Sequence, residues 1–364
     1  MGKKRVDYVL LFLVLLLAML GLFMLYSTSA YNGRVKFADS FYYLKKQFFA
    51  TSVGLLPMYL VSCMDYRNLK NLAVPGYVLS LFLSAMVLLV GDSYNGSRRW
   101  LSFGPLSFQP SEYAKLAVVV LLASVISNVG DRMKSWKNMF LVLLMTLPVV
   151  GLVGTNNLST AVIILGIAVI LIFVANPRFL PFVWLGMSGC GFVGIFLGVE
   201  SYRLERLAIW RNPELYEKGY QTMQGLYAIG SGGLFGVGFG ESMQKLGFVP
   251  EAQNDMIFSI ICEELGLMGA CGVLLLFGLV IWRLMVIATH TQELFGTLLA
   301  AGVMGHILIQ VILNVAVVTN TIPNTGITLP FVSYGGTSVL FLLSEMGLAL
   351  NISRSHPHGE RGIC

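Results

Sequence analysis

The chain has 364 residues, of which 56% are hydrophobic and only 12% charged, and its net charge is +6. A soluble domain carries roughly twice this charged fraction, so the composition excludes a soluble protein and indicates a polytopic membrane protein. The positive charge needs no nucleic-acid partner, because basic loop residues fix membrane topology and meet anionic headgroups. The cysteines and histidines show neither CxxC nor zinc-binding spacing, so no disulfide framework and no metal site is expected.

Ten apolar segments are long enough to cross a bilayer as helices. The first uncharged run, residues 8–27, exceeds a signal-peptide core and has no convincing cleavage site, so we expect it to be retained. The predicted fold class is an all-α polytopic membrane protein, a single integral membrane domain over residues 1–364, with a large extracytoplasmic loop at about 200–255 between the seventh and eighth helices. The expected spans are 8–28, 44–64, 71–91, 110–128, 138–154, 158–176, 179–199, 256–283, 294–319 and 335–353.

Lysines and arginines in the short loops predict the orientation, because cytoplasmic loops carry an excess of them. An even number of spans returns both termini to the basic side, so we expect both termini in the cytoplasm of a bacterial cell and the polar loops outside. The residues assigned to the cytoplasmic side are Lys3, Lys4, Arg5, Arg67, Lys70, Arg132, Lys134, Lys137, Arg178, Arg283, Arg354 and Arg361.

The first polar loop places arginines beside an aromatic residue. Arg99 and Trp100 follow an Asn-Gly turn signal, and they suit either substrate phosphate or simple headgroup anchoring. Pro110 opens the next span, Glu112 lies in its first turn, and Lys115 follows on an apolar helix. A lysine at that depth needs a partner or a wet cavity, although a snorkelling lysine is the alternative.

The long loop holds two further arginines, Arg203 and Arg206, interleaved with aromatic residues. Guanidinium groups bind phosphate oxygens in bidentate fashion, so these residues suit a lipid pyrophosphate, with headgroup anchoring again the alternative. Six glycines then crowd residues 230–240. No strand precedes GVGFG, so a dinucleotide site is rejected in favour of a glycine-rich re-entrant or hinge segment.

Three acids mark the passage from a polar loop into an apolar helix at residues 245–266. Asp255 stands where the polar part stops, and Glu263 and Glu264 follow about two turns deeper. Ionisable residues at membrane depth indicate function, but a helix cap at Asp255 and structural ion pairs at the glutamates remain open. We expect Lys115 to form a buried ion pair with Glu263 or Glu264.

The last polar block, residues 323–338, combines two prolines, three glycines and several hydroxyl groups, Ser333 among them. These residues forbid a plain membrane helix. Non-helical backbone at membrane depth is tolerated where it lines a cavity or is buried in protein.

Five blocks of the chain, in order, resemble the SEDS family of bacterial membrane proteins, which includes FtsW, RodA and SpoVE. They are NGSRRW (95–100), FQPSEYAKLA (108–117), GYQTMQGLYAIGSGGLFGVGFG (219–240), PEAQNDMIFSIICEELG (250–266) and PNTGITLPFVSYGGTS (323–338). The last block is closest to the FtsW and SpoVE branch. One departure is Asn156-Asn157, where the family often has Pro-Asp.

This resemblance implies a peptidoglycan glycosyltransferase that polymerises lipid II at the outer face of the cytoplasmic membrane, for cell division or spore cortex formation. It implies Asp255 as the catalytic residue, and it also implies a class B penicillin-binding protein and other divisome proteins as partners. A sugar hydroxyl attacking an anomeric carbon needs a general base, for which Asp255 is the candidate. The candidate substrate-binding residues are Arg99, Trp100, Lys115, Arg203, Arg206, Gln221 and Ser333.

Two other classes of function stay open on the sequence. A lipid II transporter without covalent chemistry would need a polar path across the bilayer, whereas a polymerase gathers its polar groups on one face. The plain cytoplasmic loops favour the enzyme, and a pure scaffold would leave Asp255 and Lys115 without a reason. A divalent cation could assist the pyrophosphate leaving group, but no motif specifies one.

Overall fold

The computed structural model describes residues 6–94, 97–103, 106–176, 178, 182 and 207–354. Nine of the ten expected spans correspond to long helices within these residues, and the expected span 179–199 lies almost entirely outside them. The nine helices are α1 (Tyr8–Phe37), α2 (Tyr42–Cys63), α3 (Leu69–Val90), α4 (Pro110–Val129), α5 (Trp136–Gly154), α6 (Leu158–Ala175), α10 (Ile257–His290), α11 (Leu294–Val318) and α12 (Gly336–Arg354). The shorter helices are η1 (Tyr66–Asn68), η2 (Gly130–Lys134), η3 (Pro213–Leu215), η4 (Glu217–Gly219) and α9 (Tyr220–Gly232).

Eight helices in the described part are long and apolar enough to cross a membrane, and the chain is a multi-pass membrane protein. The ninth long helix, α2, is not among them and carries the polar run Lys45, Lys46 and Gln47 near its N-terminal end. The expectation of an all-helical membrane fold is confirmed. The number of spans and the position of the long loop stay predictions.

The loop after α3 is more regular than expected. It forms a small antiparallel sheet in the order β1-β2-β3, with β1 at Asp92–Tyr94, β2 at Ser97–Phe103 and β3 at Leu106–Phe108. Arg98, on β2, donates from Nη1 to the carbonyl of Leu88 at 3.1 Å, near the C-terminal end of α3. Strands this short carry little periodicity, so the sequence pattern indicated only a turn.

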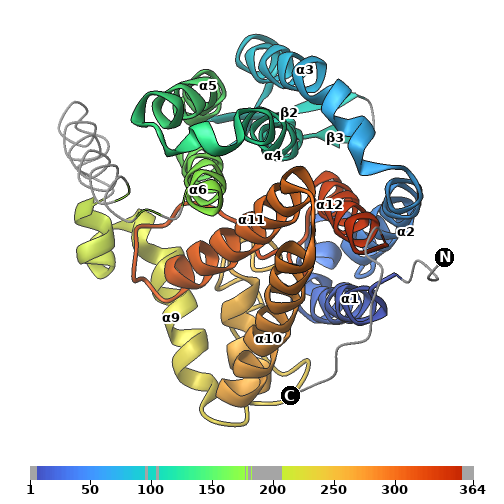
Figure 1. Cartoon of the computed structure of the whole chain (residues 1–364). Helices are drawn as coiled ribbons and strands as arrows, with labels where there is room; N and C mark the ends of the chain where they lie inside the picture. The colour runs from blue at the N-terminus through green and yellow to red at the C-terminus, as the bar shows by residue number, and fades with distance from the viewer. Residues whose placement is uncertain are drawn as a thin grey trace.

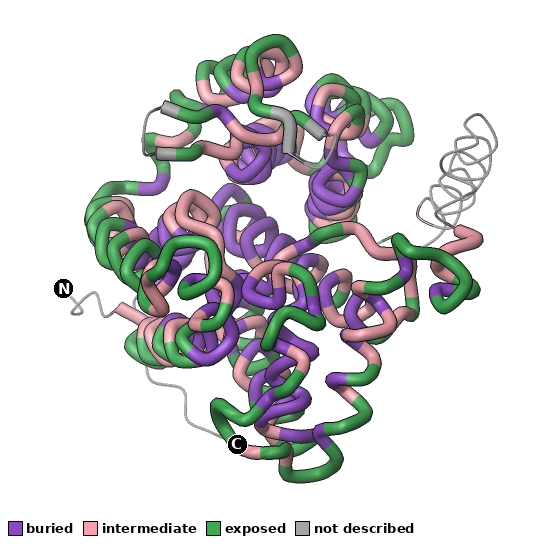
Figure 2. Tube along the Cα trace, turned by 180° about the vertical axis from the view of Figure 1, so that it is seen from behind, coloured by how far each residue is buried: buried purple, intermediate pink, exposed green. Residues whose placement is uncertain are grey.

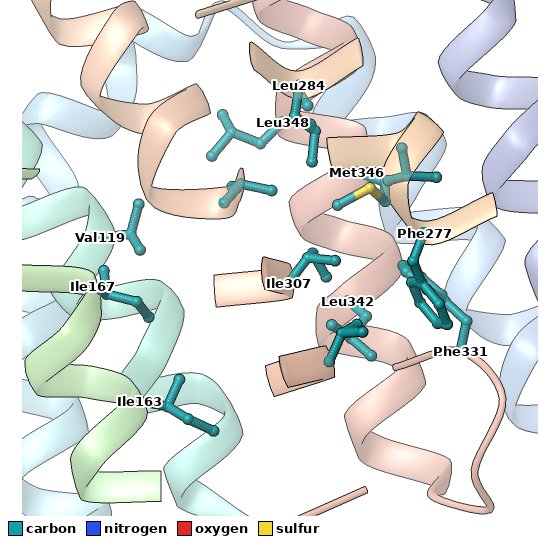
Figure 3. Close-up of a cluster of buried hydrophobic side chains, with 14 of the residues drawn as sticks. Val119, Ile163, Ile167, Phe277, Leu284, Ile307, Phe331, Leu342, Met346 and Leu348 are labelled. Carbon is teal, nitrogen blue, oxygen red and sulfur yellow. The ribbon is translucent and has the colours of Figure 1, made fainter. Parts of the chain in front are cut away.

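The core is organised around α11, which lies between α4 and α6 on one side and α10 and α12 on the other (Figure 1). Buried positions gather at the centre of the molecule and exposed ones on the outer helices (Figure 2). Ile307 of α11 packs within an apolar cluster to which all five helices contribute (Figure 3). The labelled members are Val119, Ile163, Ile167, Phe277, Leu284, Ile307, Phe331, Leu342, Met346 and Leu348.

Helix α10 is broken at Gly266, whose φ of 66° and ψ of −170° are not helical. The carbonyls freed at Glu263 and Glu264 accept hydrogen bonds from the backbone amides of residues 237 and 238, at 2.9 and 3.1 Å. In return the amides of residues 267 and 268 donate to the carbonyls of residues 233 and 234. The glycine-rich segment therefore docks against the break in α10. Only glycine fits at 236, because a Cβ there would lie 2.1 Å from the Glu264 carbonyl oxygen.

Both ends of the described chain lie at the same end of the helix bundle. The amide of Asp7, just before α1, donates to Ser353 Oγ near the end of α12 at 3.1 Å. The Asp7 carboxylate also pairs with Arg283 of α10 at 2.5 Å. We refer to this as the terminal end, and to the opposite end, where α10 begins, as the site end.

Candidate functional site

Asp255 lies at the site end, two residues before α10 begins, in a segment of turns. Its side chain is partly exposed. Gln221, in the first turn of α9, donates from Nε2 to Asp255 Oδ1 at 3.3 Å. The backbone carbonyl of Asp255 accepts a bond of 2.8 Å from Nδ2 of Asn314 on α11. Asp255 is thus held by two other helices, its carboxylate by Gln221 of α9 and its backbone carbonyl by Asn314 of α11.

The 323–338 block lies on another side of Asp255 and forms a wall of the site. Asn324 donates from Nδ2 to Gln221 Oε1 at 3.4 Å, which links this block to α9. Gly326 has a φ of +69°, and a Cβ added there would lie 3.9 Å from Asp255 Oδ2 and 3.7 Å from Arg99 Nη1. The positive φ favours glycine at this position, and the backbone here lies near both a carboxylate and a guanidinium group.

The surroundings of Asp255 raise its pKa. Burial is the main cause, because it disfavours the charged carboxylate, and the nearby charge of Glu251 adds to it. The hydrogen bond from Gln221 and the charge of Arg99 act in the opposite direction, and the pKa of Asp255 lies at about 6. A carboxylate with this pKa is ionised at neutral pH and basic enough to accept a proton from a substrate hydroxyl.

Arg99 is fixed on β2 by the turn between α5 and α6. Its Nε donates to the carbonyl of Asn156 at 3.0 Å, and Asn156 Nδ2 donates back to the carbonyl of Arg98 at 2.8 Å. Trp100 is the next residue on the same strand, so its side chain points to the opposite face and is partly exposed.

The departure at Asn156-Asn157 now has a physical account. Asn157 is the N-cap of α6, where its side chain accepts a hydrogen bond from the amide of Thr160. Asparagine and aspartate are about equally good N-caps, so an acid is not needed for this role.

Lys115 does not pair with Glu263 or Glu264, and that prediction was wrong. It is buried in α4 and pairs with Glu112, one turn earlier on the same helix, at 2.9 Å. Lys115 Nζ also donates to Gln310 Oε1 at 3.1 Å, and Ser338 donates to Glu112 at 2.8 Å. A partner at i−3 costs no distortion of the helix, so a pair across helices was unnecessary.

The two glutamates of α10 instead hold the loop before it. Lys245 Nζ lies 2.7 Å from Glu264 Oε1, which also accepts a bond from Ser27 of α1. Glu263 accepts bonds from the hydroxyl of Ser242 and the amide of Met243. Both acids lie beside the break in α10 and have structural partners, which was the alternative left open for them.

The remaining candidates divide into two groups. Ser333 is buried, and its hydroxyl accepts a bond from the amide of Leu329 at 2.8 Å, so it shapes the 323–338 block from within. Arg203 and Arg206 lie outside the described residues. Among residues 6–354 that are described, no group of three or more His, Cys, Asp or Glu could hold a metal ion, so no metal site is assigned.

Sequence reasoning missed a stripe of polar residues on α11. Asn314, Gln310 and His306 are each four positions apart, which places them on one face, and all three are buried. The spacing was a visible signal, but two neutral amides and one histidine in an apolar helix do not stand out as charges do.

Fold and site together define a class: a polytopic helical membrane protein with a carboxylate of raised pKa at one end of its helix bundle. The chain belongs to the FtsW, RodA and SpoVE family, whose model, described as cell cycle protein, matches residues 8–358.

Its relatives and structural neighbours match over almost their whole length. Stage V sporulation protein E of Bacillus subtilis is 40% identical over 97% of this chain and 98% of its own. A protein of Trichlorobacter lovleyi described as probable peptidoglycan glycosyltransferase FtsW is 35% identical, over 95% of this chain and 93% of its own.

A chain from a solved peptidoglycan synthase complex that coordinates polymerization and crosslinking has a TM-score of 0.81 and 32% identity, over 96% and 98% of the two chains. The crystal structure of the rod shape determining protein RodA of Thermus thermophilus gives a TM-score of 0.72 with 31% identity, over 98% of this chain and 99% of the RodA chain.

Proposed function

We propose that this protein is a peptidoglycan glycosyltransferase that polymerises lipid II, with Asp255 as the general base. The observation that carries this proposal is the setting of Asp255. The carboxylate has a pKa of about 6, the residue is partly exposed, and Asp255 and Arg99 both lie near Gly326. The names of the relatives, among them peptidoglycan glycosyltransferase FtsW, support the same reaction.

The reaction joins two lipid-linked sugars. The acceptor hydroxyl oxygen forms a bond to the anomeric carbon of the donor sugar, and the bond from that carbon to the pyrophosphate oxygen breaks. Asp255 takes the hydroxyl proton, and the lipid pyrophosphate leaves with the bonding electron pair. The guanidinium group of Arg99, held by Asn156, stabilises the negative charge that develops on the leaving group.

The structure favours an enzyme over a transporter. The polar stripe on α11 begins beside Asp255 at Asn314 and ends at His306, about halfway along the helix. The same face then continues as Gly302, Leu298 and Phe295, which are buried among apolar side chains. An alternating-access transporter needs polar groups along a path through the bilayer. The polar groups on this face of α11 gather instead at the site end.

We further propose that the site end faces outward and that both termini are cytoplasmic. The short-loop charges support this orientation, since Arg67, Arg283 and Arg354 gather at the terminal end. A class B penicillin-binding protein is the proposed partner, because the structural neighbour from a synthase complex couples polymerization to crosslinking. Cell division or spore cortex formation is the proposed setting.

Purified protein incubated with lipid II, with and without such a partner, tests the proposal. Glycan polymer on gels is expected from the wild-type chain and not from Asp255→Asn. Normal polymer from the variant would reject Asp255 as the base. Transfer of lipid II across vesicle membranes without any polymer would favour the transporter.

A further inference from the structure

The polar stripe on α11, formed by Asn314, Gln310 and His306, lies beneath the site. It contacts backbone groups of the site rather than the surface that is exposed to solvent. Asn314, Gln310 and His306 are respectively 0, 2 and 1% exposed. Burying polar side chains this deeply is costly, and each hydrogen bond they make offsets part of that cost. The partners of these three side chains therefore indicate what the stripe does.

Asn314 joins two segments that are far apart in sequence. Its single Nδ2 donates to the carbonyl of Asp255 at 2.8 Å and to the carbonyl of Ile327 at 2.7 Å. The first carbonyl belongs to the turn that carries the carboxylate, and the second to the wall formed by the 323–338 block. One side-chain amide thus fixes the separation of both sides of the site.

Gln310 repeats this arrangement one turn deeper. Its Nε2 donates to the carbonyl of Thr328 at 3.0 Å. Its Oε1 accepts bonds from Lys115 Nζ at 3.1 Å and from His306 Nε2 at 2.8 Å. Two donors on the oxygen fix the orientation of the amide, so its nitrogen must point to Thr328.

The stripe is anchored at its deep end by His306. The ring Nδ1 lies 2.7 Å from Glu345 Oε2 on α12, and one proton between these two atoms satisfies both. Since Nε2 donates to Gln310, this contact completes the ring's hydrogen bonds. The anchoring runs from α12 through His306 and Gln310 to the 323–338 block.

We propose that Asn314 is a positioning residue for Asp255, with Gln310 as its support. The proposal rests on the proposed function, because it assigns Asn314 a role in that reaction. Asp255 precedes α10, so hydrogen bonds within that helix do not fix the position of its carbonyl. The bond from Asn314 fixes it instead. Without this bond the turn that carries Asp255 is free to shift. The distance from the carboxylate to the acceptor hydroxyl then changes, and the carboxylate becomes more exposed to water.

The test compares Asn314→Ala with Asn351→Ala. Asn351 of α12 is also a buried amide whose Nδ2 donates to two backbone carbonyls, those of Val61 and Met64, but at the terminal end. We expect Asn314→Ala to lower kcat roughly tenfold to a hundredfold with little change in KM, the scale of a misplaced catalytic group. The control should lose thermal stability and keep the specific activity of its folded fraction.

The pH profile of the same variants separates positioning from simple loss of fold. In the wild-type protein the acidic edge of the profile of kcat against pH should lie near pH 6. Glu251 and Arg99 are the charged groups that face Asp255. In Asn314→Ala more water reaches the carboxyl, so this edge should move from about pH 6 toward about pH 4, near the ordinary pKa of aspartate. Gln310→Met, which adds no charge, should also lower kcat and shift the acidic edge of the pH profile downward, in both cases by less than Asn314→Ala does.

Hydrogen exchange of the backbone amides of residues 253–256 provides a readout that does not depend on turnover. Faster exchange in Asn314→Ala, with wild-type exchange in Asn351→Ala, supports the proposal. Wild-type kcat, pH edge and exchange in both Asn314→Ala and Gln310→Met overturn it. A wild-type chain that makes no polymer with its partner would reject the proposed function, and the exchange data would still decide whether Asn314 positions Asp255.

Discussion

Asp255 and Glu112 are both carboxylates at the site end, and the protein treats them in opposite ways. Glu112 is buried, and it has a cation at 2.9 Å and a hydroxyl at 2.8 Å. Asp255 is partly exposed and takes a weaker bond of 3.3 Å from the neutral amide of Gln221. The buried acid is paired with a cation, whereas the pKa of the proposed general base is raised to about 6.

The largest effect is expected from breaking the Glu112–Lys115 pair. Lys115→Met leaves Glu112 as an unpaired buried charge, which typically costs about 3–5 kcal/mol of folding free energy. Thermal unfolding in detergent measures it. Lys115→Met combined with Glu112→Gln should recover much of the loss, because no charge is then left unpaired. A double variant as unstable as the single one would contradict this account.

Asp255→Asn should behave in the opposite way, losing activity while the fold gains stability. Loss of the general base should lower polymerisation by about a hundredfold or more. The raised pKa means that the folded protein disfavours the ionised carboxylate, so a neutral amide should stabilise it at pH 7, by about 1 kcal/mol or more. Activity assays and unfolding curves on one preparation check both. Lower stability together with lost activity would suggest a structural acid.

Gly326→Ala should lower activity by about tenfold. The new Cβ lies close to both Asp255 and Arg99, and a φ of +69° strains any residue with a side chain by about 1 kcal/mol. Gly130→Ala is the matched control, because its φ is +56° and a Cβ there has no neighbour within 4 Å. Equal activity losses in both variants would mean that backbone strain alone is responsible.

Polymerisation should depend on pH through Asp255. The base is the ionised form, so activity should be level above about pH 7, half-maximal near pH 6, and fall about tenfold per pH unit well below that. For stability the sign is reversed. Between about pH 4 and 6 the folded protein keeps a proton that the unfolded chain has lost, so the contribution of Asp255 to stability decreases as the pH rises. Initial rates and unfolding midpoints across pH 4–8 test both slopes.

The smallest effect is expected from Glu251→Gln. The negative charge of Glu251 raises the pKa of Asp255 less than burial does, so removing it should shift the acidic edge downward by a fraction of a pH unit. The pH profile of the variant measures this shift. An edge that moves upward would show that Glu251 acts through the hydrogen bond it accepts from Asn254 rather than through its charge.

Much of this arrangement could be predicted from the sequence, and the failures have physical causes. Asp255 was identified because it lies where a polar segment meets an apolar one. The partner of Lys115 was misassigned because a search across helices overlooked Glu112, three residues away. The role of Asn314 was not predictable, because an amide in an apolar helix does not reveal which distant carbonyls it will meet.

The break in α10 constrains how the chain is assembled in the membrane. Four backbone hydrogen bonds cross between the break and the segment that precedes the helix, and neither piece can form them alone. Peptide groups left unpaired in lipid cost several kcal/mol each, so the two pieces must be buried together. During synthesis residues 233–238 leave the ribosome before α10, so they can form these hydrogen bonds only after that helix has been made. The loop that leads to Asp255 is therefore completed only when α10 is in place.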